Sequence, residues 1–415
     1  MRSSAPYTLV FLFTSFPPEV SGTAQYNWER VQWFARQELY QVVVLAPDYH
    51  DESSLPAVPS DLREKLTIEG YPSKPWLPYK IDYVPTLGAT RHITKRLMHY
   101  RPDLIVVVDV ERLFLFSTWQ FPGRRFAKHR AIPYITEFRT DYYNFANSYP
   151  VWKILGYIFL RPLITYMYSQ FDVTLVSSKF AGQRIQQMGI PNPYVTSFVG
   201  IDVSAYSPKR RSRNHLTQWL SSDEQGNNVI LYLGRIAFEK RIDLLIEAFL
   251  ALKARHTNVS LIIAGDGPDH CVNALKRLSE QSPHVHFTGF IHGETKANLL
   301  ASCDVFCSPS PYETFGRTIV EAMASGIPVV TVNSGAVTEY IINRVNGYLV
   351  QPDNVSALVD GMERVLTQDC EGIAQKAVDD AKRFSVERGC QNLNAYYQTL
   401  LGLGETPSVR SLSVI

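Results

Sequence analysis

Cysteine is scarce in this chain of 415 residues, which holds only Cys271, Cys303, Cys307, Cys370 and Cys390. An odd and scattered set of five does not form a disulfide framework. Cys303 and Cys307 stand four residues apart, but no histidine or second cysteine pair completes a zinc pattern. We therefore expect buried, reduced cysteines, no metal site and a cytoplasmic location.

Long apolar runs are also missing. Arg2 precedes the short run TLVFLF, but Pro17 and Pro18 stand where a signal peptide would carry small residues for cleavage. We read this stretch as a first buried strand. The apolar segment 154–171 is interrupted by Arg161 and Pro162, which favours a core helix over a transmembrane one.

A strong excess of charge of either sign is absent. The net charge of +2 leaves no electrostatic footprint for nucleic acid. Apolar residues make up 45% and charged residues 19%, as in an ordinary globular protein. Because 415 residues exceed one typical core, we expect two domains.

Short apolar runs alternate with amphipathic stretches of helix length. In the first half this predicts strands at 7–13, 41–47, 104–109, 134–138 and 173–178, and helices at 25–38, 91–100, 113–128, 151–170 and 179–188. After the polar stretch 209–228 it predicts strands at 229–234, 260–265, 285–290, 305–310, 328–332 and 347–350, and helices at 240–255, 269–281, 293–302, 317–325, 336–343 and 354–368. The segment 48–90 reads as loop-rich, and 403–415 as a frayed tail. Such alternation, present twice, predicts two α/β domains with parallel sheets.

Ligands of open parallel sheets bind at the carboxyl ends of the strands. In LYLGRIAFEK (231–240), Gly234 ends a strand, Arg235 follows, and Lys240 opens a helix. Two cations beside a helix N-terminus form an anion site suited to phosphate. A solvated basic turn is the alternative.

Two glycine loops follow predicted strands. Gly265 and Gly267 permit close backbone approach to a ligand, or make a tight turn with Pro268 at the first helical position. Gly22 opens a loop before the first helix, either as a backbone cradle for an anion or as an ordinary turn with Thr23 as N-cap.

The stretch YETFGRTIVEAMASGIPVV (312–330) places Glu313 before a turn at Gly316 and Glu321 in the helix after it. The first amides of that helix, from Phe315 to Thr318, are suited to a phosphate. Glu313 and Glu321 are suited to sugar hydroxyls on one extended ligand, or merely favour the helix N-terminus electrostatically.

Together and in this order, these stretches resemble glycosyltransferase family 4, the retaining sugar transferases with the GT-B fold. The E-x7-E motif here is Glu313 to Glu321, and the G-R-x4-K motif is Gly234-Arg235 to Lys240. Further landmarks are IAGDGP, the Ser-Gly loop at 21–22, VGIDVSAYSP (199–208) and NGYLVQP (346–352). The run from 313 to 330 looks most like the glycolipid-synthase branch, which includes mannosyltransferases and sulfoquinovosyl diacylglycerol synthases.

The resemblance implies two Rossmann-like parallel-sheet domains facing a cleft: an acceptor-side domain over 1–204, a nucleotide-sugar domain over 205–383, and a helix at 384–402 that returns to the first. It implies that Arg235 and Lys240 grip the donor diphosphate, Glu321 takes the ribose hydroxyls and Glu313 contacts the transferred sugar. The donor site implied by the resemblance also includes Gly22, Gly234, Gly267, Phe290, Ile291, Phe315, Gly316, Arg317 and Thr318. It implies no cofactor and no metal.

The sequence departs from the family at EFRTDYYNF (137–145). Relatives often carry a histidine where this chain has Arg139, before Thr140 and Asp141. A guanidinium is a permanent cation, whereas a neutral histidine bonds a sugar hydroxyl. Arg139 therefore suits an anionic sugar or an acceptor phosphate, or marks altered activity.

The expected function is retaining transfer of a sugar from a UDP- or GDP-sugar to a hydroxyl of a lipid, saccharide or small molecule. One alternative is a catalytically weak relative that binds sugar nucleotides as a partner protein. Another is a retaining glycosidase with Glu313 and Glu321 as its carboxylate pair, which leaves Arg235 and Lys240 without a role. The chain also has two basic stretches, at 91–101 and 123–130, and an aromatic-rich segment at 142–171. Together they either rest on an anionic membrane as a peripheral contact or form a solvated face.

Overall fold

The structure is a computed structural model and describes residues 6–19, 21–49, 55–75, 83–116, 119–139 and 159–404. The chain divides into two compact units. Among the described residues, the first unit comprises those up to 139 together with 159–200 and 386–404, and the second comprises 201–385.

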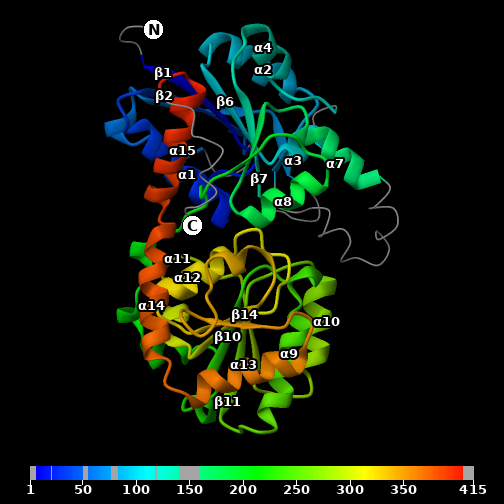
Figure 1. Cartoon of the computed structure of the whole chain (residues 1–415), viewed down its shortest axis with the longest axis vertical. Helices are drawn as coiled ribbons and strands as arrows, with labels where there is room; N and C mark the ends of the chain where they lie inside the picture. The colour runs from blue at the N-terminus through cyan, green and yellow to red at the C-terminus, as the bar shows by residue number, and fades with distance from the viewer. Residues whose placement is uncertain are drawn as a thin grey trace. The chain divides into compact units, whose positions relative to one another are not determined.

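The first unit is built on a parallel sheet of seven strands (Figure 1). In spatial order they are β3 (Leu66–Tyr71), β2 (Tyr40–Pro47), β1 (Tyr7–Leu12), β6 (Leu104–Val108), β7 (Tyr134–Phe138), β8 (Val173–Val176) and β9 (Pro193–Val195). A short antiparallel pair, β4 (Ser73–Pro75) and β5 (Tyr83–Pro85), stands apart from the sheet. The chain order reverses between β1 and β6, which makes their carboxyl ends the switch point of this sheet.

Both faces of this sheet are covered, and β1 shows why. Leu9 and Phe11 point into one apolar cluster, which includes residues of α1 (Gly22–Ala35) and α15 (Val386–Leu400). Val10 and Leu12 point into the other, beneath α2 (Ala89–Tyr100), α3 (Val110–Phe116), α4 (Arg124–Arg130), α7 (Arg161–Tyr168) and α8 (Lys179–Gln187). Alternate side chains of a strand face opposite ways, so a strand buried on both faces reads as one continuous apolar run.

The second unit repeats the plan with six parallel strands. Their spatial order is β12 (Val285–Gly289), β11 (Val259–Ala264), β10 (Asn228–Leu233), β13 (Val305–Ser308), β14 (Val329–Val332) and β15 (Tyr348–Val350). The helices are α9 (Ile242–Lys253), α10 (Asp269–Ser279), α11 (Gly293–Ser302), α12 (Arg317–Ala324), α13 (Val355–Thr367) and α14 (Glu371–Ala381). In Figure 1, α9 and α13 lie side by side, and residues of both join Ile230 and Tyr232 of β10 in one core.

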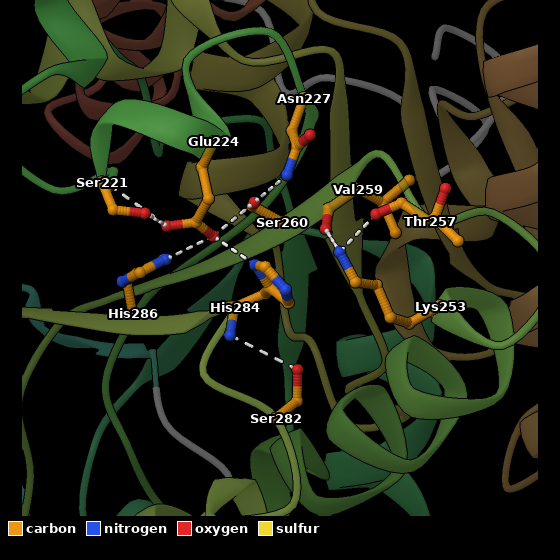
Figure 2. A network of polar contacts seen from close by, with 10 residues as sticks. All are labelled: Ser221, Glu224, Asn227, Lys253, Thr257, Val259, Ser260, Ser282, His284 and His286. Carbon is orange, nitrogen blue, oxygen red and sulfur yellow. Dashed lines mark hydrogen bonds and ion pairs between the residues drawn. The ribbon is translucent and has the colours of Figure 1, made fainter.

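A polar cluster ties the segment before β10 to the amino ends of β11 and β12 (Figure 2). Glu224 is 1% exposed, and its carboxylate accepts hydrogen bonds from the backbone and hydroxyl of Ser221, from Ser260, and from the rings of His284 and His286. Burial by itself raises the pKa of Glu224, but the hydrogen bonds from Ser221, His286, Ser260 and His284 outweigh it and hold that pKa below its usual value. The cluster is therefore a structural anchor at the end of the sheet opposite the carboxyl ends.

Several sequence predictions need correction. The segment 48–90 is not only loop, because β3 pairs with β2 there; as an edge strand with half-buried polar residues it lacks the apolar run of a central strand. The helix predicted at 113–128 is two helices, α3 and α4, and Gly123 at the start of α4 has a φ of 85°. The helix predicted at 336–343 is only a 3-10 turn, Gly335–Glu339. Its Ala336 amide donates a hydrogen bond to the Glu313 carbonyl, which lies outside the turn. Helix α14 was not predicted.

The five cysteines are buried and free, as expected. None of the described helices has the length and apolar character to cross a membrane. Of the predicted helix 151–170, only the part from residue 159 lies within the described residues, as do only residues 403 and 404 of the tail.

Candidate active site

The predicted donor residues of the second unit gather at the carboxyl edge of its sheet. The chain leaves β10 toward β11 and β12 and returns on the other side at β13, so β10 and β13 flank the switch point. Gly234, Gly265, Phe290 and Ser310 lie just after β10, β11, β12 and β13. Because the strands are parallel, the loops that carry the predicted motifs meet at one edge.

Two cations of this edge are held by carboxylates. Nη2 of Arg235 lies 2.8 Å from Oε1 of Glu239, and the Arg235 carbonyl accepts a hydrogen bond from the Tyr232 hydroxyl. Nζ of Lys240 lies 2.6 Å from Oε1 of Glu313. Lys240 ends a 3-10 turn, Phe238–Lys240, rather than opening a helix as predicted, since α9 begins two residues later at Ile242. One guanidinium group, of Arg235, and one ammonium group, of Lys240, therefore lie in the loop that follows the buried strand β10.

The glycines of IAGDGP are explained by the backbone beside them. Gly265 has a φ of 141°, and a Cβ there would lie 1.8 Å from the Gly234 carbonyl oxygen. A Cβ on Gly267 would lie 1.9 Å from the Ile236 carbonyl oxygen. The loop after β11 thus packs against the loop after β10 without side chains between them. This close approach accounts for both residues by tight packing, and Pro268 caps α10 rather than being its first residue.

Gly316 makes the turn between Glu313 and α12. Its φ is 82°, and a Cβ there would lie 2.8 Å from the Tyr340 hydroxyl, which itself donates to the Phe315 carbonyl at 2.6 Å. Phe315 is buried, while Arg317 and Thr318 are half-buried at the first turn of α12. The first amides of a helix have no partner within it, so the start of α12 presents donors at this edge.

Glu321 is the most deeply buried carboxylate of the predicted set, with 2% of its side chain exposed. Its Oε1 lies 2.9 Å from Nζ of Lys296 and 3.9 Å from Nη2 of Arg317. Its Oε2 is buried and has no hydrogen-bond partner in the part of the chain that the structure describes. A buried acceptor without a donor is costly, so this oxygen is suited to receive donors from a ligand.

Phe290 and Ile291, predicted to line the base site, lie on the loop from β12 to α11. The Phe290 side chain is 54% exposed, and its ring lies 5.9 Å from the ring of His292. Ile291 is half-buried. An exposed aromatic face on this edge offers a stacking surface to a planar ring.

In the first unit, Gly22 is the first residue of α1. The N-cap is Ser21, whose hydroxyl accepts from the Ala24 amide at 3.1 Å, and not Thr23 as the ordinary-turn reading had it. Gly22 therefore lies at a capped helix start after β1, near the switch point of its own sheet.

Arg139 follows β7 and belongs to a buried charge cluster. Its guanidinium pairs with Glu137 at 2.6 Å, donates to Oδ1 of Asn27 at 3.0 Å, and faces the Tyr26 ring. Glu137 also pairs with the fully buried Arg30. Burial by itself raises the pKa of Glu137, but Arg139 and Arg30 outweigh it and lower that pKa. Thr140 and Asp141, which complete the family-like stretch, lie outside the described residues.

Some residues of these sites were missed by sequence reasoning. They are Glu239, Lys296 and Tyr206 in the second unit, and Arg30, Glu137 and Asn27 in the first. Glu239 is adjacent to Lys240, and its position beside a predicted phosphate ligand was the one usable signal. Tyr206 and Glu137 lie within the stretches VGIDVSAYSP and EFRTDYYNF, but nothing in those stretches marks them as site residues. Lys296, Arg30 and Asn27 lie in none of the motifs, and their partners are distant in sequence.

In the comparison with known proteins, the family match lies within the second unit. Residues 220–384 match the family model described as glycosyl transferases group 1. Over 402 residues the chain is 28% identical to a GDP-mannose-dependent alpha-mannosyltransferase of Mycolicibacterium smegmatis, covering 94% of this chain and 96% of that protein. It is 33% identical, over 42% of its length and 44% of the relative, to a GDP-mannose-dependent alpha-(1-6)-phosphatidylinositol dimannoside mannosyltransferase of Mycobacterium tuberculosis.

Among solved structures, Anabaena Alr3699/HepE in complex with UDP and glucose superposes with a TM-score of 0.70. That match covers 95% of this chain and all of the other at 19% identity, so it bears on the fold alone. The fold is the GT-B fold that the resemblance implied, with two Rossmann-like parallel-sheet units. The chain is thus similar to a named glycosyltransferase over 94% of its length, and its residues 220–384 match the glycosyl transferases group 1 model, in line with the resemblance of its motifs to family 4.

Proposed function

We propose that the protein transfers a sugar from a nucleoside-diphosphate sugar to an acceptor hydroxyl with retention of anomeric configuration and without a metal ion. The second unit binds the donor and the first unit the acceptor. The observation that carries the proposal is the buried Oε2 of Glu321, an acceptor without a partner among the described residues, on the same sheet edge as Arg235 and Lys240.

The donor site follows from these side chains. Arg235, Lys240 and the first amides of α12 bind the diphosphate, and the Glu321 carboxylate accepts hydrogen bonds from the ribose hydroxyls. Phe290 and Ile291 contact the base, and Glu313 contacts the transferred sugar. Counting the charged residues of this edge, four cations (Arg235, Lys240, Lys296 and Arg317) stand beside three carboxylates (Glu239, Glu313 and Glu321). The diphosphate therefore competes with Glu239 and Glu313 for Arg235 and Lys240.

The chemistry needs a stabilised leaving group. When the bond between the sugar and the diphosphate breaks, negative charge develops on the departing phosphate, and Arg235 and Lys240 offset it in place of a divalent metal. The departing phosphate takes the proton of the acceptor hydroxyl, so no protein nucleophile forms. With retention, a sugar that is α-linked in the donor is α-linked in the product.

GDP-mannose is the donor to test first, because the relatives that match most of the chain carry it in their names. The test incubates the protein with GDP-mannose or a UDP-sugar, a hydroxyl acceptor and a chelator, and follows nucleotide release and the anomeric proton of the product. Acceptor-dependent release with an α-linked product supports the proposal. Release that requires an added metal, or a β-linked product, contradicts it.

A lipid acceptor is favoured by the surface of the first unit. Helices α2 and α4 pack side by side, since a Cβ on Gly123 would lie 2.5 Å from Leu97 (Figure 1). Six cations on or next to them are exposed: Arg91, Lys95, Arg101, Arg125, Lys128 and Arg130. Met98 on the same stripe of α2 as Lys95 is 58% exposed, and the nearby Glu69 is already paired with Arg96. We propose that this face contacts an anionic membrane surface from the cytoplasm.

Flotation with vesicles tests this contact. Binding to phosphatidylglycerol-containing vesicles, lost in high salt and in the Lys95→Glu, Lys128→Glu double variant, is expected. The matched control is Lys376→Glu, which changes an exposed lysine of the second unit. Equal binding to neutral phosphatidylcholine vesicles, or none to either, contradicts the proposal.

The weak-relative alternative rests on Arg139, which stands where relatives often carry histidine. In the structure its guanidinium is engaged by Glu137 and Asn27. Nucleotide binding without any transfer to a screen of acceptors would favour this alternative. The glycosidase alternative is not favoured, because Glu313 and Glu321 are paired with Lys240 and Lys296 and only 2% of the Glu321 side chain is exposed.

A further inference from the structure

Lys296 is a lysine of α11 that no motif singles out. Its ammonium lies 2.9 Å from Oε1 of Glu321 and 5.4 Å from the centre of the Tyr206 ring. The side chain of Lys296 is 19% exposed, so it sits in a partly desolvated position between an aromatic face and a buried carboxylate. A cation there interacts more strongly than one in water.

The buried Glu321 needs such a cation. A carboxylate that is 2% exposed is costly to bury unless it is paired and hydrogen-bonded. Arg317 is 3.9 Å away, beyond hydrogen-bond distance, whereas Lys296 is within it. A donor diphosphate bound at the same edge would add negative charge and increase the cost of the ionised carboxylate. Lys296 is therefore the cation that partners Glu321 most directly.

The contact between Lys296 and Glu321 also involves only one of the two carboxylate oxygens. Lys296 bonds to Oε1 alone, and Oε2 is the oxygen without a partner among the described residues. A side chain fixed at one oxygen presents the other in a defined place. Tyr206 supports the arrangement from the segment between the 3-10 turns Val203–Ala205 and Pro208–Arg210. Its ring backs Lys296, and burial keeps the pKa of its hydroxyl above the usual range, with the nearby Glu321 carboxylate acting in the same direction.

We propose that Lys296 is a positioning residue, which orients Glu321 so that its Oε2 selects a ribose over a deoxyribose nucleotide. This inference rests on the proposed function, because it assigns the ribose to Glu321. Lys296 itself does not touch the donor. Its removal should therefore weaken the recognition of the ribose while sparing the diphosphate contacts of Arg235 and Lys240.

Calorimetric titration of GDP and 2′-deoxy-GDP into wild type, Lys296→Met, Lys296→Arg and Lys376→Met tests this. Lys376→Met is the matched control, since it removes a lysine–carboxylate pair with Asp380 from the exposed surface of α14. Wild type and the control should prefer GDP by about tenfold or more, the size of one hydrogen bond to a charged group. In Lys296→Met this preference should fall to near one, with 2′-deoxy-GDP affinity nearly unchanged. Lys296→Arg, which keeps the cation, should restore part of it.

The outcomes separate the inference from the proposed function. A Lys296→Met protein that binds GDP with the wild-type preference overturns the inference and leaves the function intact. A Lys296→Met protein that loses affinity for both nucleotides equally, with Lys296→Arg behaving the same way, shows a merely structural role and also overturns it. If wild type binds neither GDP, UDP nor their deoxy forms, the proposed function fails and the inference fails with it.

Discussion

Nζ of Lys240 lies 2.6 Å from Oε1 of Glu313, although 73 residues separate them in the sequence. The pair joins the loop after β10 to the loop after β13 across the switch point of the sheet. In the proposed donor complex Lys240 turns toward the diphosphate, so Glu313 competes with the ligand for the same ammonium group.

This competition predicts effects of opposite sign. Lys240→Ala should weaken GDP binding by tenfold or more, because it removes a phosphate ligand and leaves Glu313 partly buried without its cation. Glu313→Gln should leave GDP binding unchanged or tighter while lowering sugar transfer by about 10²-fold or more. Calorimetry and a transfer assay on both variants measure this. A loss of GDP affinity in Glu313→Gln equal to that in Lys240→Ala would mean that the pair serves only the fold.

Gly265→Ala should destabilise the second unit. A Cβ there would lie 1.8 Å from a backbone oxygen, and the φ of 141° is unfavourable for any other residue. We expect a loss of at least about 2 kcal/mol in the free energy of unfolding, measured by urea denaturation. Gly372→Ala in α14 is the control: nothing lies within 4 Å of its added Cβ, and helical alanine should stabilise by up to about 1 kcal/mol. Equal effects in the two variants would refute the close approach of the loops.

Much of the fold could be predicted from the sequence because both faces of each sheet are buried. Strands such as β1, β6 and β11 appear as continuous apolar runs, and their order with the helices indicates parallel sheets. β3 was missed, because its edge position leaves Thr67 and Glu69 partly exposed and breaks the apolar run. The extent of the turn Gly335–Glu339 also depends on a contact with Glu313 from a distant loop.

The candidate site shows the same limit. Arg235, Lys240, Glu313 and Glu321 were predicted because they lie within short motifs next to strand ends. Their partners were not, since Lys296 and Glu321 meet only when α11 packs beside α12. The glycines of IAGDGP pose the opposite problem: the sequence left a ligand role open, and the structure explains them by backbone packing.

Glu224→Gln should destabilise the protein and flatten its acid sensitivity. The folded-state pKa of Glu224 is lowered, so its contribution is fully present above the ordinary pKa of about 4.5 and is lost as the pH falls below it. Loss of hydrogen bonds to a buried charge should cost about 2 kcal/mol at pH 7. Urea denaturation at pH 7, 5 and 4 measures this. If the difference in unfolding free energy between wild type and variant stays constant down to pH 4 and below, the lowered pKa of Glu224 is contradicted.

Glu111→Gln should have the reverse pH dependence. Burial raises the pKa of Glu111 to about 7, against the opposing hydrogen bond from Tyr168 at 2.6 Å. A raised carboxyl pKa favours the protonated form, so this group's stability contribution is present below about 4.5 and is lost as the pH rises through about 7. The variant should be more stable than wild type at pH 8, by a few kcal/mol at most, and similar to it near pH 5. Thermal unfolding at the two pH values measures this, and equal stability at pH 8 would contradict it.

The most direct test of the account is calorimetric titration of GDP and UDP, separately and with a chelator present, into wild type, Arg235→Ala and Arg255→Ala. Arg255 is the matched control, since it is an exposed arginine paired with Glu363 on the surface of the second unit. We predict that wild type and Arg255→Ala bind one nucleotide, GDP by the names of the relatives, and that Arg235→Ala loses at least tenfold in affinity. Binding of neither nucleotide, or equal binding in all three proteins, would contradict the central claim that this sheet edge grips a nucleoside diphosphate.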